Sequence, residues 1–265
     1  MTMIAPESLD FHTARALLEW QMELGADEPV GEVPVNRYAL APEAPKVAPR
    51  AAEVVTPLVM AADADPVVLA RAAASAAGDL ADLAERQAAY DLCELKKGAR
   101  NFVFADGNPA ARVMIIGEAP GRDEDMEGRP FVGRAGQLLD RMFAAIGLSR
   151  GAPDAGTSFY ITNVLPWRPP GNRDPEPAEI AMMLPFLTRH VELADPDLIV
   201  LMGNTPCAAA LGSRGILRLR GKWTTAFGKP ALPMTHPAYL LRNPAAKREA
   251  WADLLEIRAR LRGLM

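Results

Sequence analysis

Short apolar runs alternate with longer stretches of helical periodicity from residue 111 onward. Consecutive apolar positions predict buried strands at 113–118, 158–164, 197–203 and 231–236. Apolar positions at helical spacing predict helices at 134–147, 176–194, 204–211 and 244–262. Alternation of strand and helix predicts an α/β fold, with a mostly parallel sheet covered by helices on both faces.

The first part of the chain has a different pattern. Residues 7–25 are amphipathic at helical spacing, and Gly25 is placed to end that helix. Residues 26–65 are rich in Pro and Ala, which is typical of a linker. An Ala-rich helix is expected from Pro66 to Cys93. We therefore expect an N-terminal helix with an acidic linker over 1–65, and an α/β domain with a leading helix over 66–265.

Three of the predicted strands end in polar or glycine-rich segments. They are GEAPG at 117–121, TN at 162–163 and THPAYLLRNP at 235–244. In a parallel sheet the ligand site lies beyond the carboxyl ends of the strands. We therefore expect these three segments to meet at one crevice.

Composition limits the class of protein. The 265 residues are 49% hydrophobic, which supports a globular core, and no run of 18 apolar residues is present. The start of the chain does not resemble a secretory signal. Two cysteines are too few for a disulfide scaffold or a four-thiolate metal site, and three histidines leave little room for a zinc enzyme. We expect a cytoplasmic protein, outside the membrane, without a protein-ligated metal.

Charge is distributed unevenly along the chain. Residues 1–65 hold 4 Lys and Arg against 11 Asp and Glu, whereas residues 212–262 hold 11 against 3. A basic C-terminal region on an acidic protein suggests a polyanionic partner. The alternative is a solvated basic helix face.

The glycine-rich turn at 117–136 follows a strand and leads into a helix. Its backbone amides can approach a phosphate or carbonyl closely, although it matches neither GxGxxG nor the phosphate loop. Glu118, Asp123 and Glu124 are candidates to orient water, and Glu118 is favoured because it follows the strand directly. For Asp125 and Glu127 we prefer a surface-turn role.

Three further side chains carry candidate chemistry. Phe131 lies in the glycine-rich segment, where an aromatic ring can stack on a ligand; its alternative is a core position. Asn163 ends a strand and offers a donor beside an acceptor, or else caps a turn. His236 ends another strand and can donate a proton or hydrogen bond; the alternative is a buried histidine bonded to a backbone carbonyl.

Residues 238–242, AYLLR, form an apolar and basic segment that we expect to be a loop. That composition suits a wedge into nucleic acid, with the arginine on a phosphate. Alternatively, its leucines pack on the body of the protein.

The segments GEAPGRDEDMEGRPFVGRAGQLLD, TNVLPWRPPGNRDPEP and THPAYLLRNP resemble the three signature segments of family 4 uracil-DNA glycosylases. The similarity extends over roughly residues 88–260. It implies a three-layer α/β/α sandwich with a short, four-stranded, central parallel sheet. It also implies hydrolysis of the N-glycosidic bond of a deoxyuridine flipped out of DNA, which releases uracil and leaves an abasic site.

The resemblance also implies roles for individual residues. Glu118 would orient water, with Asp123 and Glu124 as secondary candidates, and His236 would stabilise charge on the leaving uracil. Uracil would be bound by the backbone of Ala119 and Gly121, by stacking on Phe131 and by pairing with Asn163. DNA would be contacted by Leu240, Leu241, Arg242 and Arg168.

The sequence departs from that family at the ligands of its iron–sulfur cluster. The four cysteine positions correspond here to Tyr90, Cys93, Trp167 and Met183, and one thiolate cannot hold a [4Fe–4S] cluster. We expect hydrophobic packing in place of the cluster, as in clusterless bacterial relatives, and no cofactor. The segment LPWRPPGNRDP lacks the histidine-containing insertion of relatives that trap the abasic sugar covalently.

Two other classes of function remain as alternatives. One is a non-catalytic binder of uracil-containing or abasic DNA, and the other is a hydrolase of free nucleosides. Intact Glu118, Asn163 and His236 favour the enzyme over the binder, and the basic C-terminal region disfavours the nucleoside hydrolase. We expect a monomer that acts on uracil-containing DNA, single- or double-stranded.

Overall fold

The computed structural model describes Arg15 and residues 65–263. The predicted helix at 7–25 and the linker at 26–65 lie outside the described residues, apart from Arg15, which is helical, and Asp65. The boundary between residues 65 and 66 therefore stays a prediction. Residues 65–263 all belong to one compact unit.

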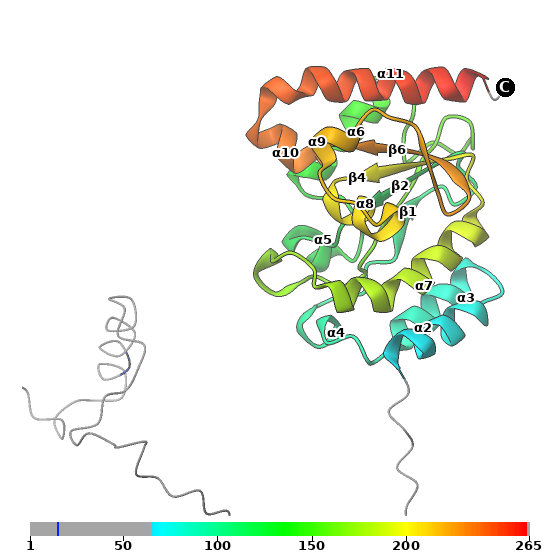
Figure 1. Cartoon of the computed structure of the whole chain (residues 1–265), viewed down its shortest axis with the longest axis vertical. Helices are drawn as coiled ribbons and strands as arrows, with labels where there is room; N and C mark the ends of the chain where they lie inside the picture. Colours follow the sequence, from blue (N-terminus) through cyan, green and yellow to red (C-terminus); the bar gives the residue numbers. More distant parts are fainter. Residues whose placement is uncertain (1–14, 16–64, 264–265) are drawn as a thin grey trace, which may run out of the picture. The chain divides into compact units, whose positions relative to one another are not determined.

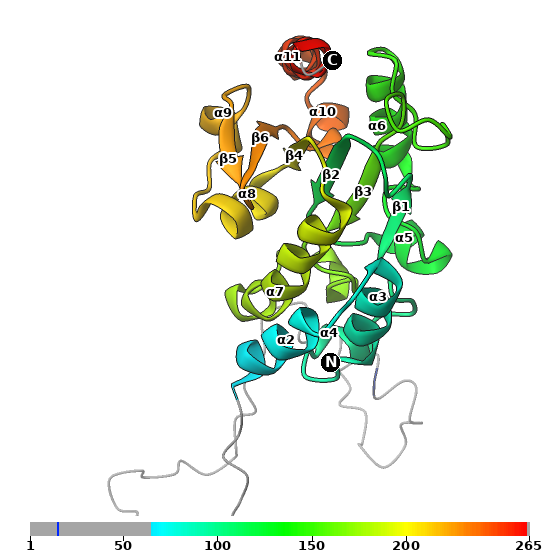
Figure 2. The same cartoon turned by 90° about the vertical axis from the view of Figure 1, so that its right-hand side faces the viewer.

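Six strands form one mixed sheet in the order β1-β3-β2-β4-β6-β5 (Figures 1 and 2). Their bounds are β1 Ala105–Gly107, β2 Val113–Gly117, β3 Tyr160–Asn163, β4 Leu198–Met202, β5 Thr224–Ala226 and β6 Lys229–Met234. The four central strands are parallel, as the sequence pattern predicted. The edge strands β1 and β5 are antiparallel and were not predicted, because three residues such as ADG or TTA give no apolar run.

Helices cover both faces of the sheet and make three layers (Figure 1). Met114 and Ile116 of β2 belong to one core cluster, while Val113 and Ile115 belong to the other. Alternate residues of a strand point to opposite faces, so this buried apolar run requires cover on both sides. The first cluster includes α2 Pro66–Ser75, α3 Leu80–Ala89, α7 Pro177–Ala194 and α8 Asn204–Leu211. The second includes α6 Arg134–Ala144, α10 Pro237–Arg242 and α11 Lys247–Gly263.

Shorter helical segments connect these elements. They are α4 Leu95–Gly98, α5 Arg122–Glu127, α9 Ile216–Leu219, η2 Pro170–Asn172 and η3 Pro244–Ala246. Of the helices in the part of the chain that the structure describes, none is long and apolar enough to cross a membrane.

Two predictions about local structure are wrong. The single helix expected from Pro66 to Cys93 is divided into α2 and α3, and Asp79 begins α3 by accepting a hydrogen bond from the Asp82 amide at 2.9 Å. The expected loop at 238–242 is the helix α10. Pro237 takes its first position, where a missing N–H costs nothing, and His236 is its N-cap.

Candidate active site

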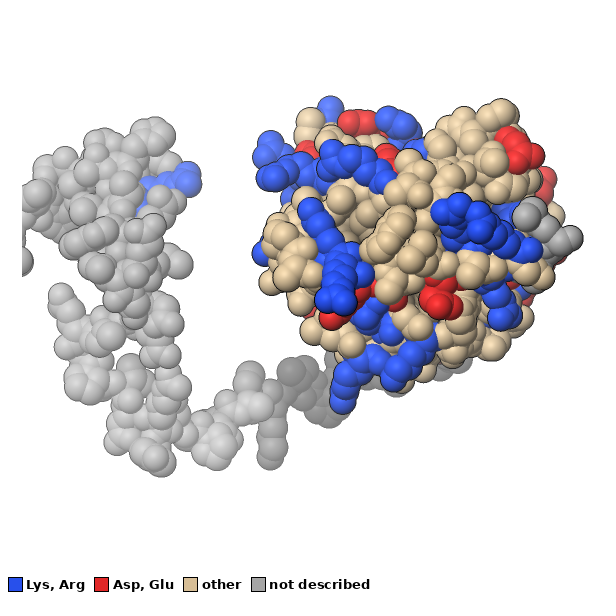
Figure 3. Space-filling model, turned by 90° about the horizontal axis from the view of Figure 1, so that it is seen from above, with Lys and Arg blue, Asp and Glu red and all other residues tan. Residues whose placement is uncertain are grey.

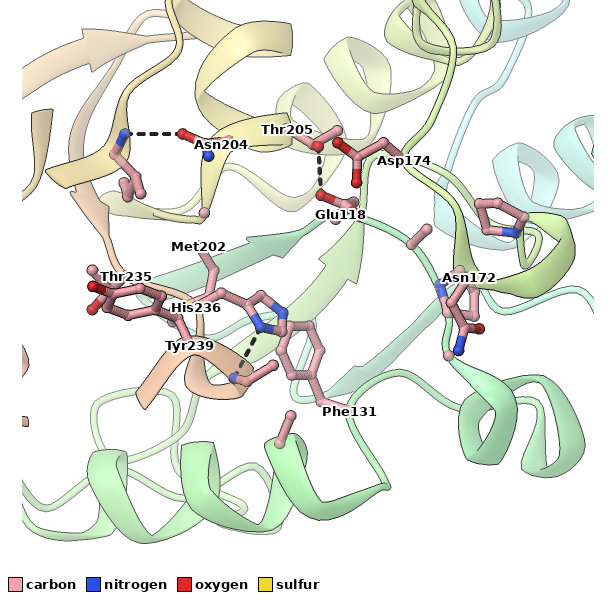
Figure 4. A pocket seen from close by; sticks show the side chains of 18 of the residues that line it. Glu118, Phe131, Asn172, Asp174, Met202, Asn204, Thr205, Thr235, His236 and Tyr239 are labelled. Carbon is pink, nitrogen blue, oxygen red and sulfur yellow. Dashed lines mark hydrogen bonds between the residues drawn. The ribbon is translucent and has the colours of Figure 1, made fainter. Parts of the chain in front are cut away.

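A cavity of about 570 Å³ opens beyond the carboxyl ends of β2, β4 and β6. Glu118 after β2, Phe131, Thr205 at the start of α8, and His236 before α10 all line it (Figure 4). The predicted glycine-rich turn and the HPAYLLR segment therefore do meet at one edge of the sheet. Ala119 and Gly121 also line this cavity.

Glu118 projects from the end of β2 and is half-buried. The Thr205 hydroxyl donates a hydrogen bond to Glu118 Oε2 at 2.5 Å, and Asp174 points toward the same carboxylate (Figure 4). Burial raises the pKa of Glu118, and Asp174 adds to the rise, whereas Thr205 and Arg214 lower it. The site thus holds a carboxylate whose proton affinity is set by several neighbours.

Gly117 brings Phe131 and Asn163 together. A Cβ at position 117 would lie 2.5 Å from Phe131 Cε2 and 2.3 Å from Asn163 Oδ1, so only glycine leaves room for both side chains. Asn163 is not among the residues that line the cavity, and its Oδ1 is buried without a hydrogen-bond partner in the described structure. An unsatisfied buried carboxamide oxygen is costly, and a bound ligand can satisfy it.

The loop 130–133 is fixed by hydrogen bonds on two sides. Arg150 donates from Nη1 to the Pro130 carbonyl at 3.0 Å and from Nη2 to the Phe131 carbonyl at 2.9 Å. Glu124 Oε1 accepts from the amides of Val132 and Gly133, at 3.0 and 2.9 Å. Phe131 has a φ of 53°, an unfavourable value for an aromatic residue, so these contacts are needed to hold it there.

These contacts correct the expectations for the neighbouring acids. Glu124 lines the cavity, but its oxygens are engaged by the amides of Gly121, Val132 and Gly133, so it holds the loop rather than a water. Asp123 is exposed and does not line the cavity. Asp125 is buried, not on the surface as expected, and accepts from two backbone amides, including that of Arg100 at 2.8 Å.

His236 presents a neutral imidazole to the cavity. Its Nδ1 accepts a hydrogen bond from the Ala238 amide at 3.2 Å, which places the ring proton on Nε2. Burial, together with Arg242, lowers the pKa of His236 to about 4. The ring centroids of Phe131 and His236 are 5.4 Å apart (Figure 4). Phe131 and His236 therefore form one wall, opposite Glu118.

Arginines surround the mouth of the cavity. Arg173, Arg214 and Arg242 all line it and are exposed. Figure 3 shows further Lys and Arg side chains gathered on the side that carries α11. Arg168 lies outside the cavity lining and donates to Asn172 Oδ1 at 2.7 Å, which ties the loop before α7 together.

The two leucines of α10 have different environments. Leu240 is fully buried in the core with α6 and α11, so the expectation that it contacts DNA is wrong. This burial agrees with the alternative that the leucines of this segment pack on the body of the protein. Leu241 is 36% exposed, and Arg242 is exposed beside it. Of the three residues of α10 that were predicted to contact DNA, Leu241 and Arg242 remain candidates.

The four positions that the family resemblance assigns to cluster ligands are occupied by core side chains. Tyr90, Cys93, Trp167 and Met183 are all buried in the core that α2, α3 and α7 share with the sheet. Gln87 Nε2 lies 3.7 Å from Met183 Sδ, and burial raises the pKa of the Cys93 thiol. A tyrosine, a tryptophan and a thioether beside one protonated thiol do not fit a [4Fe–4S] cluster.

Several residues of the cavity were not predicted from sequence patterns, among them Thr205, Asp174 and Arg214, which act on Glu118. Thr205 could have been found from the sequence, because it comes shortly after the third predicted strand, at the same end of the sheet at which Glu118 lies on the first. Asp174 and Arg214 lie in loops without periodicity, and only the folded chain brings them to Glu118.

The comparisons with known proteins point to one superfamily. The sequence matches the family model of the uracil DNA glycosylase superfamily over residues 104–255. A type-4 uracil-DNA glycosylase of Archaeoglobus fulgidus is 40% identical over 174 residues, which cover 62% of this chain and 84% of that protein. The type-4 enzyme of Saccharolobus solfataricus is 39% identical over 179 residues, 64% of this chain and 80% of the relative. That of Thermotoga maritima is 39% identical over 166 residues, 61% and 82% of the two chains. Because the family model spans more than half of its length, the chain belongs to the uracil DNA glycosylase superfamily.

Proposed function

We propose that this protein is a uracil-DNA glycosylase that removes uracil from DNA in repair. The observation that carries the proposal is the gathering of Glu118, Phe131, Asn163 and His236 at one end of the sheet, in a chain of this superfamily. Relatives named type-4 uracil-DNA glycosylase support the same activity.

Base recognition rests on Phe131 and Asn163. The enzyme must take the deoxyuridine out of the stack to reach its C1′ atom, and Phe131 stacks on the extruded base. The Asn163 carboxamide accepts from uracil N3–H through its unpartnered Oδ1 and donates to O4. Cytosine offers an unprotonated N3 and an amino group there, so it is rejected. The backbone of Ala119 and Gly121 completes the base site.

Bond cleavage rests on Glu118 and His236. As the bond between C1′ and uracil N1 breaks, the electron pair leaves with the base and negative charge grows on O2. The neutral His236 donates to O2 from Nε2, without a prior protonation step. The ionised Glu118 orients water toward the cationic C1′ and stabilises its charge. Water adds to C1′, the proton that it loses neutralises the uracil anion through solvent, and free uracil and an abasic site result.

DNA contacts come from the rim of the cavity. In this proposal Arg242 binds a phosphate, and Leu241 probes the space that the flipped base leaves. The support is that both residues are exposed and that Arg242 lines the cavity. Either a single or a double strand can be presented to this rim, and a monomer supplies every group that the mechanism needs.

We further propose that the protein works without an iron–sulfur cluster. Its support is the side chains at the four ligand positions, Tyr90, Cys93, Trp167 and Met183, which pack as core. Iron and acid-labile sulfide assays on anaerobically purified protein, with a visible absorption spectrum, test this. Colourless, iron-free, active protein is expected, whereas stoichiometric iron would contradict it.

The activity is tested on oligonucleotides that differ only in one base, uracil, cytosine or thymine, by measuring free base released. Uracil alone should be released, from a single strand, a duplex or both. Tight retention of the uracil oligonucleotide without release would favour the alternative, a non-catalytic binder. Equal release from free deoxyuridine would instead favour a nucleoside hydrolase.

A further inference from the structure

The hydroxyl of Thr205 is the nearest partner of the Glu118 carboxylate. It donates to Oε2 at 2.5 Å, and Thr205 itself is only 3% exposed (Figure 4). Within residues 65–263 the structure has no hydrogen bond on the other oxygen, Oε1. A short hydrogen bond to one oxygen of a carboxylate fixes the rotation of the whole group.

The backbone at Thr205 reinforces that contact. Thr205 is the second residue of α8. Strands β2 and β4 pair in parallel over four residues, so the start of α8, which follows β4, lies beside the end of β2. Amides of a first helical turn favour a nearby negative charge. The threonine is therefore fixed by a helix that packs on the sheet, rather than by a loop.

Two further charged groups act on Glu118. Asp174, in the loop before α7, opposes its ionisation, and Arg214, in the loop after α8, favours it. These two charges have opposite signs, and burial of the carboxylate disfavours ionisation further. The hydroxyl of Thr205 is thus the principal contact that stabilises the ionised form.

We propose that Thr205 is the positioning residue of the reaction: it holds Glu118 Oε2, turns Oε1 toward the attacking water and keeps the carboxylate charged. This inference rests on the proposed function, because it assigns a partner to the residue that orients water. It requires no contact between Thr205 and the DNA.

The test compares Thr205→Val, which is nearly isosteric but lacks the hydroxyl, with Thr205→Ser, which keeps it. Single-turnover release of uracil is followed from about pH 5 to about pH 9, a range in which His236 stays neutral. Loss of a hydrogen bond to an ionised group should raise the pKa that sets the acidic limb of the pH–rate profile. In the valine variant this limb should therefore move upward by about one pH unit. The serine variant should keep the limb of the wild type.

Two controls separate positioning from folding. Thr188→Val removes a hydroxyl that donates to the Leu184 carbonyl within α7, far along the chain from Glu118, and should leave the limb unchanged. In a Glu118→Gln background, Thr205→Val should add no further loss, because the carboxylate on which it acts is gone. Thr205→Ala is made in parallel, so that a misfolded valine variant does not end the test.

The outcomes distinguish this inference from the proposed function. The inference is supported if the acidic limb moves to higher pH in the valine or alanine variant, keeps its wild-type position in the serine variant, and shows no such shift in the Glu118→Gln background. If the wild type is active and the variants without the hydroxyl keep its acidic limb, the inference is overturned and the glycosylase assignment stays intact. A folded wild type that releases no uracil overturns both.

Discussion

At the residue scale, the state of His236 follows from its position as an N-cap. The Ala238 amide donates to Nδ1, burial disfavours the charged ring, and Arg242 repels it. Its pKa of about 4 lies below the ordinary value, so the folded protein holds the neutral form at every pH above about 5. Its usable group is therefore the Nε2–H, a hydrogen-bond donor rather than an acid.

Replacement of His236 by alanine should slow single-turnover release of uracil by about 100- to 1000-fold, because the developing charge on O2 loses its donor. The loss should be the same at pH 6 and pH 8, since no titration of the wild-type ring falls between them. Rates measured at both values check this. A wild-type rate that rises as the pH falls through about 6.5, in step with an ordinary histidine, would contradict the neutral form.

At the scale of elements, the loop 130–133 depends on α6 as well as on Arg150 and Glu124. A Cβ on Gly136, in the first turn of α6, would lie 1.7 Å from the Phe131 carbonyl oxygen. The helix can start directly beneath the loop only because that atom is missing. Loop and helix therefore position the Phe131 ring together. Within the loop, the Phe131 carbonyl and the Gly133 amide both have hydrogen-bond partners.

Gly136→Ala should displace the loop, lower kcat/KM by at least about tenfold and destabilise the fold by about 1–3 kcal/mol. Thermal unfolding and steady-state kinetics give the two quantities. The matched control is Gly98→Ala in α4, where an added Cβ meets nothing within 4 Å and the protein should be unchanged or slightly more stable. Equal behaviour of the two variants would show that the loop does not depend on this close approach.

The elements differ in how far the sequence could predict them. Central strands such as β2 are uninterrupted apolar runs buried on both faces, so their pattern is unambiguous. Helix α10 is six residues long, between His236 and Asn243, and a helix that short leaves no period to detect. The hydrogen-bond partners of Phe131 could not be predicted from the sequence, because Arg150 lies 19 residues further along the chain in a segment without a periodic pattern.

At the scale of the whole molecule, charge is separated along the chain. The basic residues of 212–262 include Arg214 and Arg242 at the cavity, and Lys247 and Arg248 at the start of α11. Binding that depends on phosphates releases counterions, so its strength must fall as salt rises. An overall negative charge of −4 does not prevent this, because a phosphate at the cavity mouth interacts most strongly with the charges near it, and exposed arginines lie there.

Arg242→Ala should weaken binding of a uracil oligonucleotide and reduce the slope of log Kd against log salt by about 1. Titrations at several salt concentrations measure that slope. Arg86→Ala serves as control: it removes a cation from α3, which pairs with Asp82 and belongs to the opposite helical layer, and should leave the slope unchanged. If Arg242→Ala and Arg86→Ala alter the slope equally, the DNA does not bind specifically at the cavity mouth.

The proposed chemistry depends most directly on Glu118, at a cavity proposed to recognise uracil in DNA. The most direct test uses wild type and Glu118→Gln on a labelled oligonucleotide with one uracil, followed by alkaline cleavage at abasic sites, with binding measured in parallel. We predict cleavage by the wild type and a loss of at least about 100-fold in the variant, with binding retained. Undiminished cleavage by Glu118→Gln would contradict the account.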